Sequence, residues 1–533
     1  MKFYQNIRHI SSLVTITGII TLSCFTASAM AKSSKAANVR VTTTTTTTEA
    51  TTATETTTET TTVEVFTNED GTPMSDREIA AYKIVKKTPN VGANTIIKPK
   101  VEDTFEETDG YIKSNRCFSF ATGDSYNIMR YEFKAGNTQP LTNLIHIPGS
   151  SIEIRYVDDN DQWKMTTDLN NVSKKTLFIN TDKCSAVVGI PGVYRDSYVN
   201  NTLEVLPDEE KPVTITKVAD GYNISYNFAG KYGTIGEIWY LYSDGKLADW
   251  TNAEHFKILK QDMDKTHRIA FDGYYYPVPY NYHPYGERML YRQPSNYVGA
   301  LFVRNGYFPA ANELGYVLTY TCMKNQNVQG YWATGPQSDW LTTDFNIGAG
   351  FYDTRFNTDF AVNLLESYKK YGSEEFLFAA VKYAEYYKEH ARNNSYKTVY
   401  GGVLVEDYGS YSGNHIKTHV SLNHHLAEMN FLYELYDVTG EETYLQLADT
   451  MLKGIEDTKD QWVLQDNNLN YALYYTGTYN TMKDYPYLTY NDLFTTKKIL
   501  NKYFNKSNAT IEYLMACKLD WMQKNNVTGY YTE

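Results

Sequence analysis

The second half of the chain repeats a helical pattern at a regular interval. Short turns with glycine or asparagine fall at Gly306, Gly372, Gly440 and Asn505, roughly 65 to 68 residues apart. Apolar residues on both sides of each turn recur at helical spacing, so each turn is expected to join two helices. Four such helical hairpins, side by side, predict an α/α toroid. The predicted hairpins are 296–325, 358–392, 418–457 and 486–524.

The repeat also predicts where a ligand would bind. Because the tight turns all lie at one end of such a toroid, the long connections must lie together at the other end. These connections are 326–357, 393–417 and 458–485. Long loops on a compact scaffold usually carry function. We therefore expect residues that are far apart in the sequence to converge on one face.

The first half of the chain carries strand signals instead. Residues 152–156 alternate between apolar and charged side chains, and the Asp-Gly pair at 220–221 marks a hairpin turn. We therefore expect an antiparallel β domain over 100–294 and an α/α-toroid domain over 295–533, which makes the fold class α+β. The tyrosine-rich exit of the β domain, 272–291, is expected to lie against the helical domain.

Two further segments precede the predicted β domain. Residues 1–31 combine a positively charged start, a short apolar run and small residues suited to cleavage, which predicts an export signal or an anchor. The threonine run 42–62 cannot bury apolar surface, so we expect a disordered spacer over 32–99 and ordered structure from about residue 100. A spacer behind an export signal predicts a secreted or envelope-attached protein. Cys24, within that signal, could carry a lipid.

Charge and cysteine content exclude several classes of partner and site. The net charge of −12 argues against nucleic acid as the main partner. The five cysteines are widely scattered, with no CxxC spacing, so neither a zinc site nor a disulfide framework is expected. The sequence has no P-loop, GxSxG, HExxH or Cys–His motif, and it predicts no metal and no cofactor.

The stretch 400–439 holds the densest group of candidate site residues. Its first part is a loop with two acids and a tyrosine in a row, Glu406-Asp407-Tyr408. Its second part is helical by its apolar period. Polar residues crowd the start of that helix, where backbone N–H groups favour an anion: His419, Asn423 and His424. For any one of these residues, an ordinary loop followed by a capped helix is the alternative.

The loops at the predicted ligand face offer aromatic side chains, tyrosine hydroxyls and a few carboxylates. Aromatic faces suit sugar rings, and a tyrosine can transfer a proton if its pKa, ordinarily about 10, is brought down. The composition therefore favours a protein that binds or processes carbohydrate. A carbohydrate-binding protein without catalysis would have the same composition.

The order of several short motifs resembles the C-terminal domain of the D-glucuronyl C5-epimerases over 330–522. Gly350-Phe351-Tyr352 leads into a helix as the family's Gly-Trp-Tyr does. Glu406-Asp407-Tyr408 is similar to the family's acid-acid-Tyr loop. Tyr471 and Asp484-Tyr485 fall where the family has two further tyrosine motifs.

The resemblance implies an isomerase that inverts C5 of a uronic acid in a polysaccharide. Such a reaction needs acid/base groups on both faces of the sugar and donors that stabilise the carboxylate of the intermediate. By position, the family's catalytic residues correspond to Tyr408, Tyr471, Tyr485, Asp407 and Glu406. The substrate-binding residues expected on the same face are Asn423, His419, His424, Tyr352, Arg355, Trp332 and Trp340.

Three alternatives stay open at the level of the sequence. If the same carbanion expels the C4 oxygen, the enzyme is a uronan lyase. Paired carboxylates among Glu406, Asp407 and Asp484 would suit a glycoside hydrolase of the α/α-toroid type. The family's Arg and His after the first tyrosine motif are replaced here by Ala472-Leu473-Tyr474, which would also fit a catalytically inactive carbohydrate-binding surface protein.

Overall fold

The structure is a computed structural model of the 533-residue chain. It describes residues 40–52, 55–68, 70–89, 98–134, 141–170, 174–197, 199, 201–476 and 483–532. The predicted export signal 1–31, with Cys24, lies outside the described residues. Within the described part of the chain, no helix combines the length and the apolar character needed to cross a membrane.

The segment predicted as a spacer, 32–99, contains regular structure. Strands β1 (Arg40–Thr52) and β2 (Glu55–Thr67) form an antiparallel hairpin, and α1 (Asp76–Lys87) follows. Threonine is β-branched and therefore tolerates the extended backbone of a strand. Helix α1 has a capping box and buries Ala81 and Val85, so ordered structure begins well before residue 100. It packs against α7 (Glu374–Asn393).

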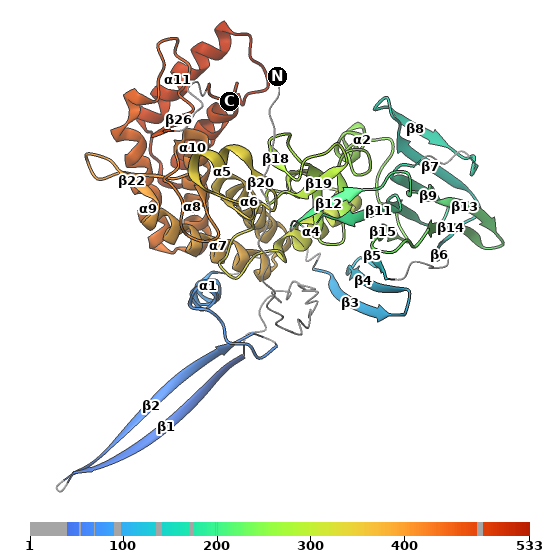
Figure 1. The fold of residues 1–533 in the computed structure, drawn as a ribbon, viewed down its shortest axis with the longest axis horizontal. Coiled ribbons are helices and arrows are strands. Elements are labelled where there is room, and N and C mark those ends of the chain that lie inside the picture. Colours follow the sequence, from blue (N-terminus) through green and yellow to red (C-terminus); the bar gives the residue numbers. More distant parts are fainter. Residues whose placement is uncertain are drawn as a thin grey trace, which may run out of the picture. The chain divides into compact units, whose positions relative to one another are not determined.

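The strands of residues 100–292 form the β domain, drawn from blue to green in Figure 1. One antiparallel sheet has the order β16-β17-β19-β12-β11-β15-β10-β9-β7-β8, and β5, β4 and β3 continue from β15. A smaller sheet has the order β13-β14-β6. The bounds are β3 (Lys100–Glu107), β4 (Tyr111–Ser119), β5 (Ser125–Phe133), β6 (Leu141–Pro148), β7 (Ile152–Val157), β8 (Trp163–Thr166), β9 (Leu177–Thr181), β10 (Ser185–Val188), β11 (Gly192–Asp196), β12 (Thr202–Val205), β13 (Thr214–Val218), β14 (Gly221–Phe228), β15 (Ile235–Ser243), α2 (Ala253–Leu259), β16 (Arg268–Ala270), β17 (Gly273–Pro277), β18 (Tyr282–His283) and β19 (Met289–Arg292).

The two sheets share a hydrophobic core. Apolar side chains of the smaller sheet, such as Ile145 and Ile224, pack with those of the larger sheet, such as Ile154 and Val188. The alternation predicted at 152–156 appears in β7, whose inward residues Ile152 and Ile154 are buried. The Asp-Gly turn at 220–221 joins β13 to β14, as predicted. The antiparallel β domain expected from the sequence is therefore present.

Helices follow the β domain and pair as the repeat predicts. Each tight turn connects two antiparallel neighbours: α3 with α4, α6 with α7, α8 with α9, and α10 with α11. The bounds are α3 (Tyr297–Asn305), α4 (Pro309–Met323), α5 (Asp339–Phe345), α6 (Thr354–Tyr371), α8 (Leu422–Thr439), α9 (Glu442–Asp457), α10 (Leu488–Phe504) and α11 (Ala509–Lys524), with a 3-10 turn over Lys459–Gln461.

Three of the four tight turns contain a residue with a left-handed backbone, whereas Gly306 at the first turn has φ of −78°. Gly372 and Gly440 end their helices with φ of 68°, and Asn505 ends α10 with φ of 48°. Glycine and asparagine adopt this conformation most readily, which is why they mark the repeat in the sequence.

Within each of the last three hairpins the first helix is the inner one. Helices α6, α8 and α10 pack side by side, with α3 against α6, and α7, α9 and α11 each pack on the helix before them. Helix α8 is buried along most of its length. Helix α9 instead buries one face, through Tyr444, Ala448, Met451 and Ile455. The result is a row of inner helices backed by outer helices (Figure 1, yellow to red).

Short strand pairs connect the long loops at the N-terminal ends of the inner helices. β21 (Tyr352–Asp353) pairs with β24 (Tyr408–Gly409), and β25 (Val420–Ser421) pairs with β26 (Ala472–Leu473). β22 (Ser395–Lys397) pairs with β23 (Val403–Val405). β18 of the β domain pairs with β20 (Gln337–Ser338), so the tyrosine-rich exit does lie against the helical domain. The predicted convergence of the long loops is confirmed.

The cysteines of the described residues are free thiols. Cys184 and Cys322 are buried, and Cys117 and Cys517 are partly exposed. No disulfide joins the predicted domains within the described part of the chain.

Candidate functional site

An aromatic cluster marks the place where the long loops meet. It consists of Trp340, Tyr408, His419, Tyr471 and Tyr485. The ring of Tyr408 lies 5.4 Å from that of Trp340 and 5.8 Å from that of His419. Tyr471 lies 6.0 Å from His419 and 5.8 Å from Tyr485. Residues from all three long loops therefore share one cluster. The side chain of Tyr485 is 45% exposed, so the cluster reaches the protein surface.

Asp407 lies fully buried beneath this cluster as an ionised carboxylate. Its Oδ1 accepts the backbone N–H of Ser421 at 2.9 Å, and its Oδ2 accepts the Ser421 hydroxyl at 2.5 Å. The imidazole Nε2 of His419 lies 3.3 Å from Oδ2, and the Nδ1 of His424 lies 3.8 Å from it. Burial raises the pKa of Asp407, but the two imidazoles and the Ser421 hydroxyl outweigh burial and hold it below its ordinary value.

Asp353 is a second buried carboxyl group at the same place. It is the N-cap of α6, and its Oδ1 accepts the backbone N–H of Phe356 at 2.9 Å. Burial, together with the negative charge of Asp407, raises the pKa of Asp353 to about 7. The backbone links the two acids, because the N–H of Thr354 donates to the Asp407 carbonyl at 3.0 Å. Asp353 can therefore carry a proton at neutral pH while Asp407 remains an anion.

The charge of Asp353 acts on all three predicted catalytic tyrosines. Burial and the charge of Asp353 raise the pKa of Tyr408 and of Tyr485, and burial and the charge of Asp407 raise the pKa of Tyr471. A tyrosine that acts as a base must lose its proton near the working pH, which requires a lowered pKa. The environment of these tyrosines acts in the opposite direction. Tyrosine-based proton abstraction, as the resemblance implies, is therefore not favoured by the electrostatics of the site.

The carboxylate of Glu406 forms its contacts within its own loop and at the start of the next segment. Its Oε2 accepts the backbone N–H of Thr418 at 2.8 Å and lies 3.3 Å from the Nε2 of His415. Its carbonyl oxygen contacts the Nε2 of His390 at 2.9 Å. The side chain is fully buried. Glu406 therefore braces the loop 393–417, although it was predicted as a catalytic residue.

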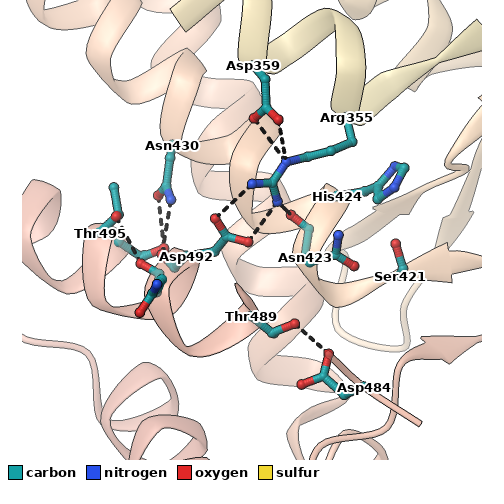
Figure 2. Close-up of polar contacts among 12 residues, drawn as sticks. Arg355, Asp359, Ser421, Asn423, His424, Asn430, Asp484, Thr489, Asp492 and Thr495 are labelled. Atoms are coloured by element: carbon teal, nitrogen blue, oxygen red, sulfur yellow. Dashed lines mark hydrogen bonds and ion pairs between the residues drawn. The ribbon is translucent and has the colours of Figure 1, made fainter. Parts of the chain in front are cut away.

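Arg355 joins the starts of three inner helices. Figure 2 shows its guanidinium between the carboxylates of Asp359 and Asp492. Its Nε lies 2.9 Å from Asp359 Oδ1, and its Nη1 lies 2.7 Å from Asp492 Oδ2. Nη1 also donates to the carbonyl oxygen of Asn423 at 2.9 Å. The charge of Arg355 is thus already paired inside the protein.

Asn423 and His424 lie on the first turn of α8, as predicted. The amide oxygen of Asn423 is buried and has no hydrogen-bond partner among the described residues. Nδ1 of His424 lies 2.9 Å from the hydroxyl of Thr354. Burial, which exceeds the attraction of Asp407, lowers the pKa of His424 to about 4, so its imidazole is neutral. The free amide oxygen of Asn423 is suited to a hydroxyl donor from a ligand.

Two predicted binding residues lie in the core instead. Trp332 is 3% exposed, and its ring packs 4.8 Å from that of Phe360. Tyr352 is fully buried, and its hydroxyl lies 3.0 Å from that of Tyr383. Neither ring has a free face for a sugar, so the prediction that they bind substrate does not fit the structure.

Asp484 is held by a buried lysine. Its Oδ2 lies 2.5 Å from the Nζ of Lys518, and its Oδ1 accepts the hydroxyl of Thr489 at 2.5 Å. Lys518 also donates to the carbonyl oxygen of Tyr485 at 2.7 Å. Asp484 therefore anchors the segment that carries Tyr485, and its carboxylate is not available as a partner for Asp407. Within the described residues no group of three potential ligands could hold a metal ion.

Asp353 and Tyr282 are site residues that the sequence motifs did not predict. A signal for Asp353 was available, because an aspartate directly before a helical period is a typical N-cap. Tyr282 comes from the β domain, and its ring lies 6.1 Å from that of Phe351, next to the aromatic cluster. Only the pairing of β18 with β20 brings it there.

Comparison with known proteins gives remote similarities to solved structures. Neither a protein-family model nor a curated protein sequence matches the chain. A family 76 glycoside hydrolase from a bovine Bacteroides thetaiotaomicron strain is similar over 80% of this chain and 78% of its own, with 11% identity and a TM-score of 0.36. A bacterial glucoamylase complexed with acarbose is similar over 79% of this chain and 58% of its own, with 14% identity and a TM-score of 0.25.

An unsaturated glucuronyl hydrolase with the oligosaccharide dGlcA-Glc-Rha-Glc is similar over 43% of this chain, with 13% identity and a TM-score of 0.30. The chain spans 60% of the length of that hydrolase. No C5-epimerase is among the matches. At these identities and TM-scores, the likeness says nothing about the activity of this chain, which must be inferred from the site itself.

Proposed function

We propose that the protein is a carbohydrate-active enzyme of the glycoside-hydrolase type, with Asp353 as its general acid. The observation that carries this proposal is the pair of carboxyl groups whose pKa values are shifted in opposite directions, Asp353 upward to about 7 and Asp407 downward. Such a pair supplies a proton donor and an anion at the same pH. Cleavage of a glycosidic bond requires a proton donor, and a nearby anion stabilises the positive charge that develops on the sugar.

The proposed reaction assigns one role to each acid. The protonated Asp353 donates its proton to the leaving oxygen as the bond between that oxygen and the anomeric carbon breaks. Water then adds to the anomeric carbon and gives a proton back to the Asp353 carboxylate, which restores the acid. The fully buried Asp407 does not reach the substrate. Its charge keeps the proton on Asp353 and stabilises the positive charge that develops on the sugar ring. Asp407 is therefore a positioning residue.

Aromatic rings around the acids support a sugar as the substrate. Tyr485 is 45% exposed, and Tyr471 and Trp340 are partly exposed, so each offers a face on which a sugar ring can stack. Asn423 adds an amide oxygen without a partner among the described residues. Aromatic faces combined with a few polar groups are typical of a carbohydrate site.

The test is the release of reducing ends from a panel of polysaccharides, compared between the wild type and Asp353→Asn. Asparagine is as good an N-cap as aspartate, so this change keeps the cap of α6 while it removes the proton. The rate should fall by roughly 10²–10⁴ while the melting temperature is unchanged. Asp437→Asn, an exposed change at the other end of α8, is the control. Equal rates in the wild type and Asp353→Asn would exclude Asp353 as the acid.

Chemistry at C5 of a uronate is a second candidate. The specific observation in its favour is that the three tyrosines named by the resemblance lie in one cluster: Tyr408 and Tyr471 both contact His419, and Tyr485 contacts Tyr471. Exchange of the C5 hydrogen for deuterium in D₂O would support an epimerase. Ultraviolet absorbance of an unsaturated product would support a lyase. Glycan binding without turnover of any kind would indicate a carbohydrate-binding protein.

We also propose that the enzyme acts outside the cytoplasm, secreted or attached to the envelope. This rests on the sequence of residues 1–31 and on the size of polysaccharides, which do not enter cells intact. Cell fractionation with an antibody to the helical domain tests it. Recovery of the protein in the cytoplasm alone would contradict it.

A further inference from the structure

A cavity of about 410 Å³ lies among the inner helices next to the candidate site. Side chains of α3, α6, α8 and α10 line it, together with Tyr531 of the C-terminal segment. Its volume is in the range of small-molecule sites. Arg355 connects it to the candidate site, because this residue lines the cavity and donates to the carbonyl oxygen of Asn423. Figure 2 shows the contact of Arg355 with Asn423.

Every charged side chain in the cavity wall already has a partner of opposite charge among the described residues. Arg355 pairs with Asp359 and Asp492. Two further ion pairs, at 2.8 Å and 3.6 Å, complete the set: Arg304 with Glu366, and Glu434 with Lys369. The cavity is lined by two arginines and by three acids, Asp359, Glu434 and Asp492. The described wall therefore offers no unpaired positive charge to a ligand.

The rest of the wall is made of apolar and uncharged polar groups. Leu301, Val362 and Ala427 supply apolar surface. The amide of Asn430 and the hydroxyl of Thr495 already form hydrogen bonds inside the protein, and each can form a further one with a sugar hydroxyl. The aromatic side chain of Tyr297, 45% exposed, stands at the cavity and donates its hydroxyl to Asp359. Apolar patches beside hydroxyl and amide groups match the two kinds of surface on a neutral sugar.

We propose that this cavity binds neutral sugar units of the glycan whose cleavage is proposed above, and that it excludes uronic acids. A uronate carboxylate placed here would lose its hydration without gaining a cation, and it would lie beside acidic side chains. The inference rests on the proposed function for the identity of the ligand as a substrate. Its prediction about binding is independent of catalysis.

The test measures binding by titration calorimetry in the Asp353→Asn background, which prevents turnover. The probes are neutral hexasaccharides (cello-, manno- and maltohexaose) and hexagalacturonate. Val362→Trp fills the cavity from α6, and Val438→Trp on the last turn of α8 is the matched control, because it is also a half-buried valine but does not line the cavity. Val362→Trp should weaken binding of a neutral hexasaccharide by about tenfold or more. Val438→Trp should leave it unchanged.

A second pair of variants covers the case in which Val362→Trp fails to fold. Tyr297→Ala should weaken neutral-glycan binding, whereas Tyr307→Ala, an 87% exposed tyrosine outside the cavity, should not. Equal binding in all variants, tighter binding of hexagalacturonate than of any neutral probe, or no binding of any probe would each overturn the proposal. If only the proposed function is wrong, the result is different: neutral glycans still bind in the cavity, but the wild type does not hydrolyse them.

Discussion

Asp353 and Tyr408 lie directly opposite each other in the antiparallel pairing of β21 with β24. This pairing brings the N-cap of α6 to the acidic loop Glu406-Asp407-Tyr408, which leads into α8. It buries the Asp353 carboxyl and places the Asp407 charge close by, and both effects raise the pKa of Asp353. The chemistry proposed for the site depends on this contact between segments that are distant in the sequence.

Replacing Asp407 should shift the pH dependence of the reaction. The charge of Asp407 contributes to the raised pKa of Asp353, so Asp407→Asn should lower that pKa. A general acid works only while protonated, so the activity of the wild type is lost as the pH rises through the pKa of Asp353. The basic limb of kcat/KM against pH should therefore move to lower pH in Asp407→Asn. If the basic limb of Asp407→Asn stays at the pH of the wild type, or moves to higher pH, the charge of Asp407 does not raise the pKa of Asp353.

Tyr471 distinguishes hydrolysis from tyrosine-based proton abstraction. If Asp353 is the acid, Tyr471→Phe keeps the ring on which the sugar stacks and should change kcat by less than about tenfold, whereas Tyr471→Ala should raise KM. If the tyrosine transfers the proton, Tyr471→Phe should lower kcat by roughly 10²–10⁴. Steady-state kinetics of the two variants on one glycan separates these outcomes. Tyr474→Phe, an exposed tyrosine on the same loop, is the matched control.

Arg355 should matter for stability. Its side chain is only 14% exposed between Asp359 and Asp492, so Arg355→Ala leaves two largely buried carboxylates without a cation and should cost about 3 kcal/mol of unfolding free energy. The side chain of Arg304, which forms an ion pair with Glu366, is 53% exposed. Arg304→Ala should therefore cost about 1 kcal/mol of unfolding free energy or less. Chemical denaturation of both variants measures the difference. Similar losses of unfolding free energy in the two variants would show that the ion pairs of Arg355 contribute no more to stability than an exposed ion pair.

Gly440 tests the origin of the helical repeat. Its φ of 68° is left-handed, and nothing lies within 4 Å of an added Cβ, so Gly440→Ala should destabilise the protein through backbone strain alone, by about 1 kcal/mol. Gly440→Asn should cost less, because asparagine accepts this conformation. Gly348→Ala has equally open surroundings and no left-handed backbone, so it should be neutral. Thermal melts of the three variants check this order.

The helical hairpins could be predicted from the sequence because their signals are local. A left-handed turn residue such as Gly372 and an apolar period of 3.6 residues are both visible in a short window. The site could be predicted only in part. Trp332 and Trp340 lie in the same loop, yet Trp332 packs into the core and Trp340 joins the aromatic cluster, a difference set by tertiary packing. The role of Asp353 depends on burial and on a charge from another loop, which no local pattern contains.

The segment before residue 100 could also be predicted only in part, because its helix depends on tertiary contacts. The composition of the threonine run predicts a disordered spacer. Beyond this run, however, Ser75 and Glu78 form a capping box. The N-terminal signal of α1 was therefore present in the sequence. Its stability as a helix comes from packing on α7 and from the ion pair of Glu78 with Lys382 at 2.9 Å, which involve residues about 300 positions away.

The most direct test of the site is the pH dependence of kcat/KM on a cleaved glycan, measured for the wild type and for Asp353→Asn. With Asp353 as the general acid, the wild type should lose activity as the pH rises through about 7, and Asp353→Asn should be slower by roughly 10²–10⁴ with no such limb. A wild-type rate that stays constant across pH 7, together with full activity of Asp353→Asn, would contradict the assignment of Asp353.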